Sequence, residues 1–212
     1  MSPRTESVTI TGPAGALQCA IDHPAAAPGG TALGCAVFCH PHPLFGGTMD
    51  NKVIVTLARA FVQMGYVAVR FNFRGVGRSE GAHDDGIGET EDALAVIAWA
   101  REQYGAALPL ALAGFSFGSY VQTRVAPRVD AERLVLAGPA VKRFPVGPVP
   151  ADTIVIHGEE DDVVPLADVL DWARPQALPI VVFPGCGHFF HGRLGHLRDV
   201  VAGMWRRPPS VF

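Results

Sequence analysis

A serine lies between two glycines in the segment Gly114-Phe115-Ser116-Phe117-Gly118. The apolar run 110–113 leads into this segment, and a pattern compatible with a helix follows it directly. G-x-S-x-G between a strand and a helix is typical of a nucleophile elbow, a sharp turn that exposes the serine hydroxyl. The chain passes close to itself on either side of such a serine, so the turn requires Gly114 and Gly118. Ser116 is therefore the candidate nucleophile.

Two later segments could activate this serine. A serine hydroxyl is a weak nucleophile until a base accepts its proton, and a third group must hold that base. The acidic turn Gly158-Glu159-Glu160-Asp161-Asp162 follows one apolar run, and Gly185-Cys186-Gly187-His188 follows the last one. An elbow of this kind takes its acid and then its histidine from later in the chain. His188 is the candidate base, while Asp161 and Asp162 remain nearly even as the acid on physical grounds alone.

These groups need a scaffold that brings the ends of several strands together. An antiparallel hairpin is predicted at 7–11 and 16–22, followed by buried strands at 34–39, 66–73, 110–114, 134–137, 154–157 and 180–183. Helices are predicted at 50–64, 90–104, 117–125, 165–174 and 191–205. The alternation indicates one α/β domain over 1–212, with a mostly parallel, twisted sheet and helices on both faces. The candidate residues follow strands, at the edge where such sheets build their sites.

Together these segments resemble the α/β-hydrolase superfamily over nearly the whole chain. The resemblance includes the elbow, the G-x-x-D-x-x-V-P loop from Gly158, the G-x-G-H histidine loop and the R-G-x-G-x-S loop at 74–79. A narrower similarity lies in His40-Pro41-His42-Pro43-Leu44-Phe45-Gly46-Gly47 followed by Met49-Asp50-Asn51-Lys52. This pattern resembles small bacterial serine hydrolases related to the dienelactone hydrolases. Dienelactone hydrolases use cysteine at the elbow, so Ser116 favours ordinary ester or amide substrates.

The resemblance implies a role for each candidate residue. Ser116 would be the nucleophile, and His188 the general base and then the general acid. The family spacing from Gly158 selects Asp161 as the group that orients His188. Two backbone N–H groups would form an oxyanion hole for the negative charge that develops during acyl transfer. The first would come from Phe117, directly after the nucleophile.

The second oxyanion donor would come from the loop after the first parallel strand. Pro41 and Pro43 have no N–H and cannot serve. Aligning the second His-Pro pair with the usual His-Gly of the family selects Leu44, which is the residue predicted here. Aligning the first pair instead selects His42. The side chains expected to line the substrate pocket are those of His42, Phe45, Phe115 and Phe189.

The composition argues against several other functions. Of the 212 residues 49% are apolar and 17% charged, which is typical of a globular protein. The net charge is -3 and no basic run occurs, so neither nucleic acid nor an anionic membrane is an expected partner. The pairs Lys142-Arg143 and Arg206-Arg207 are expected on a solvated surface. No signal peptide, membrane span or CxxC pair is visible, so we expect a cytoplasmic protein with reduced cysteines.

A zinc site is the rival interpretation of His188. His191 and His196 are close to it in sequence, and His40 and His42 could join them. No motif such as H-E-x-x-H accompanies these histidines, and we expect no metal and no cofactor. The R-G-x-G-x-S loop likewise lacks the third glycine of a dinucleotide-binding loop, so we interpret it as structural.

The segment between the strands ending near Gly138 and beginning near Thr153 is short and rich in proline. A helical lid is therefore not expected, and Ser116 should face an open pocket with an apolar rim. The predicted function is hydrolysis of small carboxylic esters through an acyl-enzyme. A peptidase or thioesterase using the same residues, and a non-catalytic binding protein with this fold, remain alternatives. The oligomeric state is left open.

Overall fold

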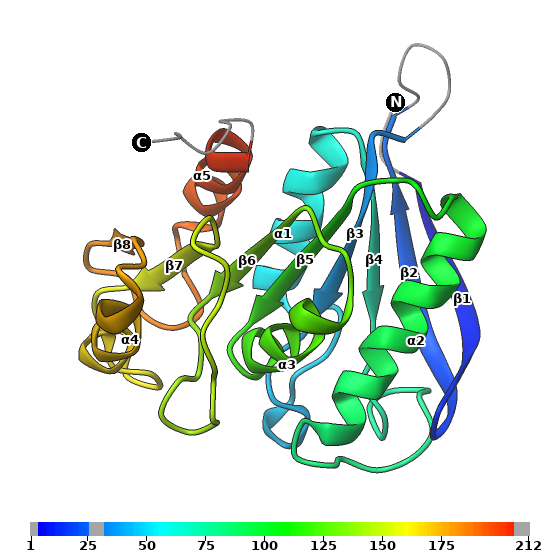
Figure 1. Ribbon diagram of the computed structural model, residues 1–212, viewed down its shortest axis with the longest axis horizontal. Helices are drawn as coiled ribbons and strands as arrows, with labels where there is room; N and C mark the ends of the chain where they lie inside the picture. Colours follow the sequence, from blue (N-terminus) through cyan, green and yellow to red (C-terminus); the bar gives the residue numbers. More distant parts are fainter. Residues whose placement is uncertain (1–3, 26–31, 206–212) are drawn as a thin grey trace.

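The computed structural model describes residues 4–25 and 32–205. It is built around one eight-stranded sheet with the strand order β1-β2-β4-β3-β5-β6-β7-β8 (Figure 1). The strands from β3 to β8 pair in parallel, whereas β1 pairs with β2, and β2 with β4, in antiparallel fashion. The predicted mostly parallel sheet with an N-terminal hairpin is confirmed. The strands are β1 (Arg4–Gly12), β2 (Gly15–His23), β3 (Gly34–Cys39), β4 (Tyr66–Phe71), β5 (Leu110–Phe115), β6 (Arg133–Ala137), β7 (Ile154–Gly158) and β8 (Ile180–Phe183).

Helices cover both faces of the sheet. Helices α1 and α5 pack on one face, while α2 and α3 pack on the other, and α4 packs beside β7 (Figure 1). The helices are α1 (Lys52–Gln63), α2 (Ile87–Tyr104), α3 (Phe117–Val125), α4 (Leu166–Ala173) and α5 (Leu194–Trp205), with 3-10 turns η1 (Pro43–Phe45), η2 (Ala126–Arg128) and η3 (Arg174–Gln176). No helix in the described ranges is long and apolar enough to cross a membrane.

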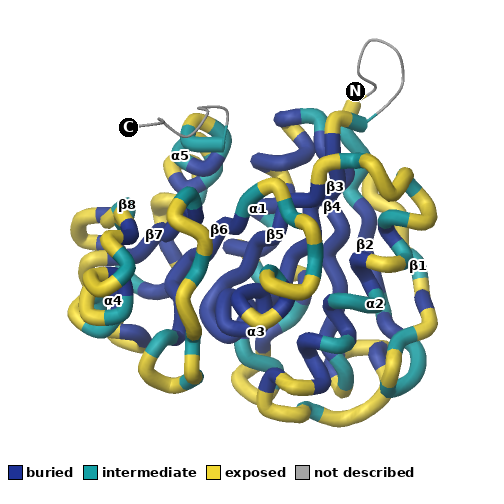
Figure 2. The backbone as a smooth tube through the Cα atoms, in the orientation of Figure 1, coloured by how far each residue is buried: buried dark blue, intermediate teal, exposed yellow. Residues whose placement is uncertain are grey.

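Burial of the central strands explains their nearly continuous apolar sequences. All residues of β3, β4 and β5 are buried, and these strands form the dark centre of Figure 2. Successive side chains of a strand point to opposite faces. Accordingly, Ala36 and Phe38 pack under α1 and α5, whereas Cys35 and Val37 pack under α2 and α3. All four cysteines are buried and unpaired.

Several predicted boundaries shift for local reasons. Helix α2 begins at Ile87 rather than at residue 90, because the buried Glu89 carboxylate accepts the Gly86 N–H at 2.8 Å and fixes the first turn. Helix α5 begins at Leu194 rather than at residue 191, after a turn in which Gly192 has a φ of 72°. The predicted surface loop at 23–31 falls largely outside the described residues, as does the Arg206-Arg207 pair.

His40 directly follows β3 and ties its end to the segment after β4. Its Nδ1 lies 2.6 Å from the Pro41 carbonyl oxygen, and its Nε2 accepts the Phe73 N–H at 3.0 Å. The Phe73 amide can only donate, so the ring proton resides on Nδ1 and the imidazole is neutral. Complete burial lowers the pKa of His40 to about 3, although the Pro41 hydrogen bond acts in the opposite direction.

This buried imidazole predicts a loss of stability in mild acid. Unfolded His40 binds a proton near pH 6.5, whereas folded His40 does so only near pH 3. The unfolded state therefore takes up more protons as the pH falls below about 6.5, and stability present above that pH is lost. His40 should lower the free energy of unfolding by roughly 2 kcal/mol between pH 7.5 and pH 5.

Urea unfolding of the wild type and His40→Gln at both pH values measures this contribution. His40→Gln should be less stable at pH 7.5 but should lose less stability on acidification. His191→Gln, which alters an exposed histidine, should keep the wild-type pH dependence. An unchanged pH dependence in His40→Gln would contradict the assignment.

Candidate active site

Ser116 occupies a strained turn between β5 and α3. Its φ of 56° and ψ of -118° are unusual for a residue with a side chain. The Ser116 N–H donates to the Ala137 carbonyl at 2.9 Å, which fastens the turn to the end of β6. A Cβ on Gly118 would lie 1.9 Å from the Cys39 carbonyl oxygen, and one on Gly114 would lie 2.4 Å from the Gly118 carbonyl oxygen. The two glycines thus allow the close backbone approach that the sequence predicted.

His188 and Asp161 form a buried pair on the loops after β8 and β7. His188 Nδ1 lies 2.7 Å from Asp161 Oδ2, whereas Asp162 is exposed. The second oxygen, Asp161 Oδ1, accepts the N–H groups of Val163 and Val164 at 2.9 and 2.7 Å. One carboxylate therefore both holds the histidine and closes its own turn, so the turn-stabilising role does not pass to Asp162.

These hydrogen bonds keep Asp161 ionised. Burial alone would raise the pKa of this carboxyl, but the hydrogen bonds from His188 and Val164 outweigh it and lower the pKa below its usual range. An ionised carboxylate can only accept, so the shared proton belongs to His188 Nδ1 and leaves Nε2 free to take another. Ser116 and His188 line the same cavity. Among the described residues no hydrogen bond joins them, and hydrogen bonds of this kind often tighten only as the reaction proceeds.

His157, which the sequence analysis did not single out, also supports the acid. It lies at the end of β7, fully buried, with Nε2 2.8 Å from the Val164 carbonyl oxygen and 3.4 Å from Asp161 Oδ2. Burial lowers the pKa of His157, so the ring is neutral at physiological pH. His157 lies at the end of a strand, four residues before Asp161, and this position was the signal that could have identified it.

The loop after β3 contains both candidates for the second oxyanion donor. Phe117 is the first residue of α3, so its N–H has no acceptor within the helix. Leu44 does not line the cavity, and its N–H donates to His42 Nδ1 at 3.2 Å. The N–H groups of Phe45 and Gly47 both donate to the His42 carbonyl. The His42 N–H has no hydrogen-bond partner among the described residues, so the geometry favours His42 and not the predicted Leu44.

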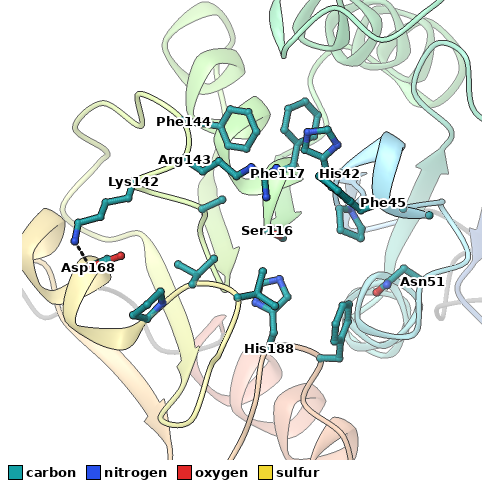
Figure 3. Close-up of a pocket in the computed structure, with 18 residues that line it drawn as sticks. His42, Phe45, Asn51, Ser116, Phe117, Lys142, Arg143, Phe144, Asp168 and His188 are labelled. Carbon is teal, nitrogen blue, oxygen red and sulfur yellow. Dashed lines mark ion pairs between the residues drawn. The ribbon is translucent and has the colours of Figure 1, made fainter.

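The cavity above Ser116 has a volume of about 380 Å³ (Figure 3). Six of the predicted residues line it, namely Ser116, Phe117, His188, His42, Phe45 and Phe189. The expectation for Phe115 is wrong, because this residue is fully buried and packs its ring 4.8 Å from the ring of His188. Phe115 therefore supports the histidine from below instead of contacting the cavity.

The segment between β6 and β7 forms one wall of the cavity. It contains no helix, so the molecule has no lid, as predicted. Phe144 stacks on Tyr120 at 4.9 Å and lies 5.0 Å from Phe117, which anchors the segment over α3. Ser116 itself is only 8% exposed, so the site is less open than expected. Lys142 and Arg143 also line the cavity, so the expected solvated pair belongs to the site.

The histidines considered as zinc ligands are dispersed. His191 and His196 are exposed on the segment leading into α5 and on α5 itself. Both ring nitrogens of His40 have partners in the protein. No group of three or more His, Cys, Asp or Glu side chains in the described part of the chain is placed to hold a metal ion.

Solved structures share this fold over nearly the whole chain. A lidless α/β serine hydrolase from Xanthomonas campestris is 38% identical, with a TM-score of 0.89, covering 100% of this chain and 99% of that one. An α/β serine hydrolase homologue from Coxiella burnetii is also 38% identical, with a TM-score of 0.86 and coverage of 93% and 96%. Together with the elbow and the sheet, these matches define a serine hydrolase of the α/β-hydrolase fold.

The family match is more specific. The model of the S15 family, described as X-Pro dipeptidyl-peptidase, matches residues 23–142, more than half of the chain. An uncharacterised protein of Rickettsia prowazekii is 31% identical over 169 residues, covering 73% of this chain and 71% of that protein. The chain belongs to the S15 family. The matched segment includes Ser116 but ends before Asp161 and His188, and the relation to dienelactone hydrolases stays a prediction.

The close approach at the elbow predicts the effect of adding one methyl group. Gly118→Ala would force the backbone of α3 away from the Cys39 carbonyl and should destabilise the fold by about 3 kcal/mol. Gly203→Ala in α5 meets no atom within 4 Å and should stabilise by about 0.5 kcal/mol. Urea unfolding of both variants measures the difference. Equal stability of the two variants would show that the turn does not require glycine.

Proposed function

We propose that this protein hydrolyses small carboxylic esters, with Ser116 as nucleophile, His188 as base and Asp161 as the orienting acid. The observation that carries the proposal is a buried Asp161–His188 pair, 2.7 Å apart, whose histidine lines the same cavity as a serine on a nucleophile elbow. The cavity volume of about 380 Å³ suits a small substrate. The aromatic rings of Phe45, Phe144 and Phe189 provide apolar walls for a short acyl group.

In the first half of the reaction, His188 Nε2 takes the proton of Ser116 Oγ as the oxygen attacks the ester carbonyl. The carbonyl oxygen becomes negatively charged and accepts hydrogen bonds from the Phe117 and His42 N–H groups. When the intermediate collapses, the bond to the alcohol oxygen breaks and His188 donates the proton to the leaving alcohol. Asp161 stays ionised and stabilises the protonated imidazole throughout.

In the second half, His188 takes a proton from water, and the resulting hydroxide attacks the acyl-enzyme. The same two N–H groups stabilise the second intermediate. Its collapse breaks the bond to Ser116 Oγ, which recovers its proton from His188, and the carboxylic acid leaves. Every proton transfer passes through His188. Apart from the ester and water, the protein therefore supplies all the groups that the reaction needs.

Membership of the S15 family makes dipeptidyl-peptidase activity the second candidate. An enzyme that removes dipeptides must bind the charged amino terminus of its substrate, and a buried or paired ammonium requires an anionic partner. Asp168 is the one carboxylate among the described residues lining the cavity, and it forms an ion pair with Lys142. The site therefore offers no free anion for an amino terminus, which favours an ester over an X-Pro peptide.

A matched pair of aspartate variants tests the proposed machinery. Asp161→Asn should lower kcat for 4-nitrophenyl acetate or butyrate by about 10³-fold or more, because the amide no longer fixes the His188 tautomer. Asp162→Asn removes the same charge from an exposed neighbour and should leave kcat unchanged. Comparable losses in both variants would contradict the assignment of the acid.

The same assay on wild type and Ser116→Ala, run beside an X-Pro-4-nitroanilide, tests the reaction class. We expect ester hydrolysis that disappears in Ser116→Ala, with little release of nitroaniline. Efficient cleavage of the anilide, with esters as poor substrates, would replace the esterase proposal with the peptidase.

A further inference from the structure

Of the charged side chains that line the cavity within the described residues, some form ion pairs and one does not. The ammonium of Lys142 forms an ion pair with Asp168, and Figure 3 shows both pointing toward each other at one end of the cavity. Arg143, the next residue, has no carboxylate partner among the described residues. The cavity therefore holds one unpaired guanidinium and no unpaired carboxylate among its described lining residues.

Contacts with the cavity walls fix the position of Arg143. Its Cζ lies 4.7 Å from the centre of the Phe45 ring, a cation–π contact that joins the wall after β6 to the loop after β3. The neighbouring Phe144 is stacked on Tyr120, which fixes the segment that carries the arginine. In Figure 3 the Arg143 side chain points into the cavity toward Phe117 and Ser116, whereas Lys142 points away.

The positive charge also affects the imidazole beside it. The pKa of His42 is lowered mainly by burial, then by His83 and by Arg143, while Glu89 and Asp85 act in the opposite direction. Arg143 therefore influences the cavity that would receive the substrate, although its own side chain is exposed.

The reaction geometry indicates which part of the substrate Arg143 would meet. His188 must donate a proton to the leaving alcohol, so the alcohol lies on the His188 side of Ser116. Figure 3 shows Arg143 on the opposite side of Ser116 from His188, near Phe117 and His42. The carbonyl oxygen occupies the oxyanion donors, and the acyl group extends away from His188 along the walls formed by Phe45 and Phe144. Arg143 lies over the Phe45 ring and directly precedes Phe144, so it would meet the far end of the acyl group.

Building on the proposed ester hydrolysis, we propose that Arg143 selects substrates whose acyl group carries a carboxylate. The preferred substrates are then half-esters of short dicarboxylic acids. A guanidinium presents parallel N–H donors that match the two oxygens of a carboxylate. The products are a dicarboxylate and an alcohol.

The test compares two 4-nitrophenyl esters that differ at one group. Mono-4-nitrophenyl adipate carries a terminal carboxylate, and 4-nitrophenyl 5-carbamoylpentanoate carries a neutral amide of the same size, four methylenes from the ester in each case. The wild type should have about a tenfold higher kcat/KM for the carboxylate, chiefly through KM, as expected for one charge-assisted contact. High salt should reduce this ratio, because the guanidinium is exposed.

Three variants test whether Arg143 causes the preference for the carboxylate ester. Arg143→Gln should bring the ratio of the two kcat/KM values to about one. Arg143→Lys keeps the charge but loses the planar fork and should retain part of the preference. Arg59→Gln removes the same charge from an exposed position on α1, outside the cavity, and should keep the wild-type ratio.

The possible failures are distinguishable. Equal kcat/KM values in the wild type, or a preference that survives in Arg143→Gln, would overturn the carboxylate site while leaving ester hydrolysis intact. A stronger preference for a charge on the alcohol, measured with 4-acetoxybenzoate against 4-acetoxybenzamide, would overturn the acyl assignment. Failure of the wild type to hydrolyse any of these esters would instead refute the proposed function.

Discussion

The close contact between the first turn of α3 and the end of β3 determines where the candidate groups can lie. Gly118 rests against the Cys39 carbonyl with no space for a side chain, and this contact brings Ser116 beside the loop that begins at His40. The N–H groups of Phe117 and His42 belong to the two backbone segments joined there. The nucleophile and its proposed oxyanion donors are thus positioned by one backbone contact at the point where the strand order reverses between β3 and β5.

The proposed acid and base depend on a second, separate arrangement at the ends of β7 and β8. Asp161 accepts hydrogen bonds through both oxygens, so the position of the histidine is coupled to the shape of the acidic turn. His157 and Phe115 support the pair from within the sheet, one beside the carboxylate and the other under the ring of His188. The reactive residues are on loops, but buried residues at strand ends hold them.

The sequence was sufficient to predict those parts of the site whose residue patterns are typical of a single structural role. The elbow glycines, the strand–helix alternation and His188 followed from such patterns, whereas choosing Asp161 over Asp162 required the family spacing. Leu44 was chosen by aligning His42-Pro43 with the His-Gly pair of the resembled family, and the sequence does not show that His42 Nδ1 accepts the Leu44 N–H. Arg143 resembles an ordinary surface residue in sequence. Only the folded path of the β6–β7 segment brings it into the cavity.

In the proposed mechanism Ser116 attacks the substrate and His188 activates the serine. The most direct test is to treat the protein with a fluorophosphonate and locate the covalent adduct by mass spectrometry of the digested chain. We predict one adduct per molecule, on the peptide containing Ser116, with labelling slowed severely in His188→Ala. An adduct on another residue, or labelling of Ser116 at an unchanged rate in His188→Ala, would contradict it.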